Sequence, residues 1–153
     1  MTTAAMVQAL TDPMGVPFYP RVFQALGVLT FSLHILFVNV AVGAAALAVY
    51  GRLWGGGPWR KLSAPLAKAA TAAVSAAILL GVAPLLFIQV LYDPFWYASN
   101  SLSAAWVIGF VFVMMAGYGL LYVFVEKGEG AGGWAGLASV LLFLTAGCIM
   151  HAL

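Results

Sequence analysis

Residues 22–50 read VFQALGVLTFSLHILFVNVAVGAAALAVY and contain no acidic residue, lysine or arginine. A helix rises about 1.5 Å per residue, so this run is longer than the ~20 residues that cross the hydrocarbon core of a bilayer. Apolar residues are continuous here and do not alternate in short strands, which argues against a transmembrane β-barrel. The stretch therefore predicts a membrane-spanning helix.

Three further apolar runs follow along the chain, at about 63–92, 102–126 and 134–153. Each is long enough to cross a bilayer. The connections between the runs are short, so we expect consecutive helices to be antiparallel neighbours. The predicted fold is therefore all-α, an integral membrane four-helix antiparallel bundle over residues 22–153. Residues 1–21, which prolines interrupt, are expected to form an interfacial N-terminal arm.

Local signals predict where the helices begin and end. Ser63 is positioned as the N-cap of the second helix, with Pro65 in its first turn. The expected connections are residues 51–61, 92–101 and 126–133.

Small and polar residues predict how the helices pack together. Lipid tails compete with apolar side chains, so helices in a membrane associate through small residues that allow close approach. Such residues recur every four positions in the second run, at Ala69, Ala73, Ala77 and Gly81. These four predict a packing seam, and Asn39 in the first run predicts a hydrogen bond between helices.

The composition excludes several classes of protein. The chain has 153 residues, 65% of them hydrophobic and 7% charged, against about 25% charged in an average soluble domain. A water-soluble enzyme and a disordered chain are therefore excluded. The net charge of +2 is too small for a nucleic-acid binder. Cys148 is the only cysteine, which excludes an intramolecular disulfide, a thiolate zinc cluster and a paired-cysteine haem attachment.

The positive charges predict the orientation in the membrane. Lysine and arginine are enriched on the cytoplasmic side of membrane helices. One side of the predicted bundle holds five of them, at Arg52, Arg60, Lys61, Lys68 and Lys127. Arg21 alone lies on the other side. We therefore expect a multi-pass protein of the bacterial inner (cytoplasmic) membrane with the N-terminus and the C-terminus in the periplasm.

The middle of each predicted span lacks acidic residues, lysine and arginine. Proton relays, ion pumps and voltage sensors need ionisable groups at that depth, so these functions are disfavoured. No paired carboxylates are available in the spans for acid–base catalysis.

The two histidines are the main candidates for a cofactor site. An imidazole in lipid needs a partner, which is a haem iron, another metal or a hydrogen bond. His34 is expected roughly 12 Å below the outer boundary and His151 roughly 3 Å below it. One haem b held by both residues conflicts with this depth difference of roughly 9 Å. Two separate sites, a site at His34 alone, or a structural imidazole at His34 and an interfacial His151 remain open.

Two further groups of residues could serve redox chemistry. Met114 and Met150 could each supply an axial sulfur to haem iron, or could simply fill space in the packing. Four residues cluster around the outer end of the second run, at Gln89, Tyr92, Asp93 and Trp96. They could bind a quinone head group beside flat apolar walls, or form a hydrogen-bonded turn in an aromatic belt.

The first apolar run resembles the first helix of cytochrome bd quinol oxidase subunit I. The likeness rests on Arg21-Val-Phe-Gln24, on the stretch from Thr30 to Val38 that contains His34, and on Gly43. A weaker likeness covers Gly81, Gln89, Trp96 and Tyr97. The resemblance implies that His34 is a haem axial ligand near the periplasmic face and that electrons pass from quinol to haem. The family's helix-three glutamate is absent from WVIGFVFVMMAGYGLLYVF, so the resemblance implies a reduced relative that does not itself reduce oxygen.

We therefore expect a membrane electron-transfer subunit of a respiratory complex, not catalytic on its own. It would bind b-type haem and exchange electrons with quinol near the periplasmic face. Other membrane and periplasmic redox subunits would be its partners, besides the lipid bilayer. The alternative is a haem-free membrane anchor or assembly subunit. A small-solute channel or transporter is disfavoured because the chain offers no pair of broken helices and no charged lumen.

Overall fold

The structure is a computed structural model that describes residues 5, 15, 19–127 and 131–152. Four α-helices account for nearly all of the described chain: α2 (Pro20–Leu53), α3 (Pro58–Leu91), α4 (Asp93–Glu126) and α5 (Ala131–Ala152). No β-strand occurs in the described residues. The predicted all-α fold is thus confirmed. The predicted N-terminal arm over residues 1–21 lies almost entirely outside the described residues.

The second helix begins earlier than the sequence predicts. Pro58 lies in the first turn of α3, where a missing backbone N–H costs nothing because that N–H has no helical partner. Ser63 is therefore inside the helix, and the predicted N-cap is wrong. The Ser63 side chain is buried and its hydroxyl donates to the carbonyl of Ala48 on α2, at 2.7 Å.

The predicted connection over residues 92–101 is also wrong, because most of it is helical. Only Tyr92 separates α3 from α4. Asp93 places a carboxylate in the first turn of α4, where the helix dipole favours negative charge. The backbone N–H of Trp96 then donates to the carbonyl of Tyr92 at 2.9 Å, and residues 93–108 contain no glycine that would end the helix.

All four helices are long and apolar enough to cross a membrane. The candidate spans comprise 34, 34, 34 and 21 residues, and ~20 suffice. Large apolar side chains lie exposed along them; Leu79 is 76% exposed and Leu102 is 89% exposed. Such surfaces are stable against lipid and unfavourable in water. The chain is a multi-pass membrane protein whose helices contact the bilayer.

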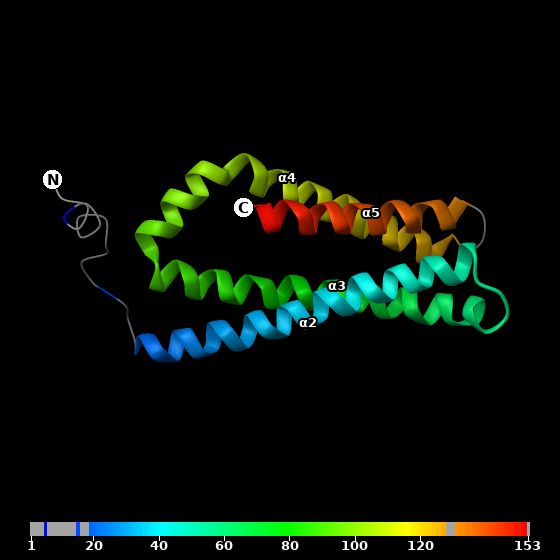
Figure 1. Cartoon of the computed structure of the whole chain (residues 1–153), viewed down its shortest axis with the longest axis horizontal. Helices are drawn as coiled ribbons and strands as arrows, with labels where there is room; N and C mark the ends of the chain where they lie inside the picture. Colours follow the sequence, from blue (N-terminus) through cyan, green and yellow to red (C-terminus); the bar gives the residue numbers. More distant parts are fainter. Residues whose placement is uncertain (1–4, 6–14, 16–18, 128–130, 153) are drawn as a thin grey trace.

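The helices form two pairs. Helix α2 packs chiefly against α3, and α4 packs chiefly against α5. The two pairs meet at the end of the molecule that holds the α2–α3 and α4–α5 connections, and they diverge toward the opposite end (Figure 1). The first part of α4 arches away from the α2–α3 pair before it joins α5 (Figure 1).

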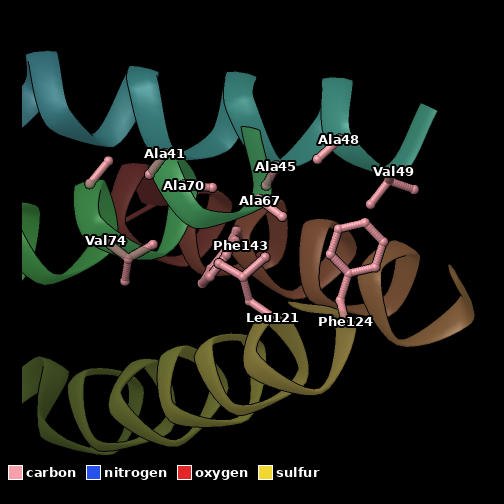
Figure 2. Close-up of a cluster of buried hydrophobic side chains, with 11 residues drawn as sticks. Ala41, Ala45, Ala48, Val49, Ala67, Ala70, Val74, Leu121, Phe124 and Phe143 are labelled. Carbon is pink, nitrogen blue, oxygen red and sulfur yellow. The ribbon is translucent and has the colours of Figure 1, made fainter. Parts of the chain in front are cut away.

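A cluster of buried apolar side chains fills the bundle near the two connections. All four helices contribute to it, α2 and α3 mostly with alanine and α4 and α5 with larger residues (Figure 2). Its members include Ala45, Ala67, Leu121, Phe124 and Phe143. Small residues on one pair accept large ones from the other, so dispersion contacts are dense there.

The predicted packing seam on α3 is confirmed at three of its four residues. Ala73 and Ala77 are buried, and Gly81 contacts α2. Ala69 is exposed instead. Residues four apart are offset by about 40° around the helix, so a series of residues at this spacing does not stay on the face that contacts α2.

Burial falls along one face of α2. Ala41, Ala45 and Ala48 point inward and are buried near the connections. The same face continues through His34 and Gly27, which are only half-buried. Helix α3 still contacts α2 at Gly27, where an added Cβ would lie 3.5 Å from Phe87. This part of α2 is therefore less buried because α4 and α5, which diverge at this end, do not pack against it (Figure 1).

Candidate cofactor site

His34 lies on the inward face of α2, two helical turns beyond Ala41. Its Nδ1 is 2.8 Å from the backbone carbonyl oxygen of Ala77 on α3. A carbonyl oxygen only accepts, so Nδ1 must carry the proton and donate. Nε2 of the neutral ring is then left with a free lone pair. Within the described residues, Nε2 has no hydrogen-bond partner.

Gly81 creates the space that the imidazole occupies. A Cβ at residue 81 would lie 2.9 Å from both Cε1 and Nδ1 of His34, which is closer than carbon and nitrogen atoms approach without bonding. The ring also lies near Phe31, with ring centroids 6.4 Å apart. Sequence reasoning recognised Gly81 only as a packing residue; its role in seating His34 depends on the register between α2 and α3.

Contacts between α2 and α5 show which residues lie level with His34. A Cβ on Gly136 would lie 2.8 Å from Cγ2 of Val49. His34 precedes Val49 by fifteen residues on α2, and His151 follows Gly136 by fifteen residues on α5. Because the two helices are antiparallel, both histidines lie about 22 Å from this contact, toward the same end of the bundle. By this count the two histidines lie level along the bundle, without the difference of roughly 9 Å predicted from the sequence, because the register of α5 on α2 sets their levels and not the ends of the apolar runs.

Met150, rather than His151, lies on the inward face of α5. Ser139, Phe143 and Ala146 are buried and mark that face. Met150 follows Ala146 by four residues and Phe143 by seven, so it continues the same stripe. His151 is a further 100° or so around the helix. Both side chains are exposed at this open end of the bundle, Met150 by 45%.

Met114 belongs to the hydrophobic packing of the bundle. It lies on the inward face of α4, seven residues before Leu121, and packs half-buried against the buried cluster. This contact accounts for an apolar side chain at residue 114 without a cofactor.

The four residues predicted for a quinone surround the corner between α3 and α4. Gln89 donates from Nε2 to the hydroxyl of Tyr97, at 3.3 Å. Tyr92 is exposed in the turn, whereas Asp93 and Trp96 are half-buried in the first turn of α4. A hollow of about 360 Å³ lies one turn further along α4. Its lining residues are Pro94, Tyr97, Ala98 and Ser101, and none of the four predicted residues is among them.

No three of His, Cys, Asp and Glu lie together as a metal site in the part of the chain that the structure describes. Haem iron needs fewer protein ligands, since the porphyrin occupies four positions around it. On the inward faces of α2 and α5, this end of the bundle offers the imidazole of His34 and the thioether of Met150, and His151 lies beside Met150 on a neighbouring face. Imidazole nitrogen and thioether sulfur are both ordinary ligands of haem iron.

Comparison with known proteins adds no relative. No protein-family model, curated protein or solved structure matches this chain significantly. By its fold the chain is an all-α, multi-pass membrane protein.

Proposed function

We propose that this protein is an electron-transfer subunit of a respiratory membrane complex that binds b-type haem through His34. The observation that carries the proposal is the free lone pair on Nε2 of an imidazole inside an apolar bundle. An unpaired polar atom is costly in lipid, and iron would satisfy it. The Nδ1–carbonyl hydrogen bond is also the arrangement that orients histidine ligands on metals.

The open, apolar surroundings of His34 support the binding of an apolar group. The two helix pairs diverge at this end, and the inward residues of α2 there are only half-buried (Figure 1). Met150 on α5, which is 45% exposed, would supply a second ligand. A haem bound there would supply a one-electron couple, whose potential the axial ligands and the burial would set.

The chain would lie in the bacterial inner membrane with both termini in the periplasm, following the positive charges near the two connections. Quinol would approach at the same end, where Tyr97 and Ser101 place hydroxyls beside the α4 hollow. Other membrane and periplasmic redox subunits would supply the catalytic centre.

The test is an optical spectrum of the purified full chain, produced in a host that makes haem. We expect a reduced-minus-oxidised α-band in the wild type that is lost in His34→Ala and kept in His151→Ala. Circular dichroism and detergent gel filtration check that both variants remain folded. A folded wild type that stays colourless would overturn the proposal and leave the haem-free anchor or assembly subunit.

A further inference from the structure

A groove with several polar side chains in a mainly apolar lining runs between α3 and α4, at the end of the bundle opposite the candidate haem site. Its volume is about 310 Å³, and its lining residues are Lys68, Thr71, Ala72, Ser75, Tyr122 and Val125. None of these residues takes part in the proposed redox function, and the groove opens on the lipid-facing side of the two helices, since Lys68, Ser75 and Tyr122 are exposed.

Lys68 lies at the edge of the hydrocarbon region. Residues 69–92 contain no charged residue, and these 24 residues span about 36 Å of helix, enough to cross the bilayer core. Among the described residues Lys68 has no acidic partner within ion-pair distance. From this depth the long side chain of a lysine extends so that its ammonium group reaches the membrane interface. There the positive charge attracts anionic groups.

A chain of hydroxyls extends from the groove into the bundle. The hydroxyls of Ser75 and Tyr118 are 2.6 Å apart, and those of Tyr118 and Tyr122 are 3.3 Å apart. Each hydroxyl has one proton to donate. When Ser75 donates to Tyr118, and Tyr118 to Tyr122, the proton of Tyr122 is free for an acceptor in the groove.

This orientation costs little. Ser75 gives up only its 3.2 Å hydrogen bond to the carbonyl of Thr71. That carbonyl already accepts the helical N–H four residues on, so it stays satisfied. The hydroxyl chain can therefore present a donor when an acceptor enters the groove.

An apolar strip continues the groove toward the middle of the membrane. Leu79 follows Lys68 by eleven residues and Ser75 by four, so it lies on the same face of α3. Met115 precedes Tyr122 by seven residues on α4. Leu79 is 76% exposed and Met115 is 65% exposed. With increasing depth, the groove thus offers a cation, then hydroxyls, then an apolar surface.

We propose that this groove binds an anionic phospholipid from the leaflet on the side of the two connections. The order of groups matches the order in a phospholipid: the phosphate would face Lys68, the glycerol esters would face Tyr122, and an acyl chain would lie along Leu79 and Met115. Basic pockets between membrane helices recognise anionic head groups in this way. A quinone head group carries no charge to match Lys68. The inference does not depend on haem binding.

The test is native mass spectrometry of the full chain released from nanodiscs that contain equal amounts of phosphatidylglycerol and phosphatidylcholine with identical acyl chains. We expect the wild type to retain phosphatidylglycerol preferentially. Lys68→Gln should reduce that retention about fivefold, the effect of losing roughly 1 kcal/mol of attraction per lysine. Tyr122→Phe should reduce it by a smaller factor, since it removes a neutral donor.

Lys61→Gln is the matched control, because it removes the same charge near the same interface but outside the groove. We expect it to leave the retention close to that of the wild type. Equal retention of both lipids by the wild type would overturn the proposal. So would equal losses in Lys68→Gln and Lys61→Gln, which would indicate attraction by the general charge of this end.

Discussion

His34 acquires its chemistry from two backbone features of α3. The carbonyl of Ala77 holds the proton on Nδ1, and the missing side chain of Gly81 leaves room for the ring. Neither feature involves a polar side chain, so neither is visible as a motif. A histidine one residue earlier or later would point about 100° away and would miss both.

Substitution of Gly81 tests this seating. In Gly81→Val the added side chain would occupy the position of the imidazole, so we expect loss of the proposed haem from a protein that still folds. The measurement is the haem content of the purified variant per polypeptide. Gly43→Ala is the control, because a Cβ at residue 43 meets nothing within 4 Å. Full haem content in Gly81→Val would show that His34 is not held in this way.

Met150 and His151 are adjacent in sequence but point in different directions, so they can be separated by single substitutions. We expect Met150→Leu to lower the midpoint potential of the haem, because a thioether ligand raises it. His151→Ala should leave the potential unchanged, as should Met115→Leu on the exposed face of α4. Redox titration of the α-band makes the measurement. A shift with His151→Ala and none with Met150→Leu would assign the second ligand to the histidine.

The helix elements are joined most tightly near the two connections. The guanidinium of Arg52 on α2 donates to the carbonyl of Phe124 on α4 and lies 3.8 Å from the centroid of its ring. A cation at the carboxyl end of α4 is also favoured by the helix dipole. Ser139 on α5 is fully buried and donates to the carbonyl of Gly117 on α4, at 2.7 Å.

Gly136 is a residue at which α5 closely approaches both α2 and α4. A Cβ there would lie 2.7 Å from Cε2 of Phe124 and 2.8 Å from Cγ2 of Val49. We expect Gly136→Val to destabilise the bundle by about 1–3 kcal/mol through overpacking. Reversible unfolding in mixed micelles measures this. Gly147→Ala on the same helix meets nothing within 4 Å and should not destabilise the bundle; equal stability of the two variants would contradict the packing described here.

The whole molecule is asymmetric along the membrane normal. The end with the two connections has the buried cluster and most of the lysines and arginines, whereas the opposite end has His34, Met150 and half-buried inward faces. At the first end, side chains from all four helices pack closely together. The second is packed less closely, because α4 and α5 diverge there from α2 and α3 (Figure 1).

The orientation of this asymmetry can be tested with reporter fusions at Leu153. If the positive charges near the connections lie in the cytoplasm, a C-terminal alkaline phosphatase should be active and a C-terminal green fluorescent protein should be dark. Replacing Arg60 and Lys61 by asparagine should weaken this bias. A fluorescent fusion in the wild type would show that the termini are cytoplasmic and would move the proposed haem to the inner leaflet.

The sequence alone determined that the chain forms four membrane helices, because the requirement for long apolar runs with internally satisfied backbones acts locally, within each segment. It did not determine where α3 and α4 begin, since Ser63 and residues 92–101 suit both a helix end and a helix interior. Only the tertiary structure decided that His34 meets Ala77 and Gly81 and that Met150 rather than His151 faces inward. The physical reason is that these contacts depend on the rotation and register of whole helices, and one residue of helix turns a side chain by about 100°.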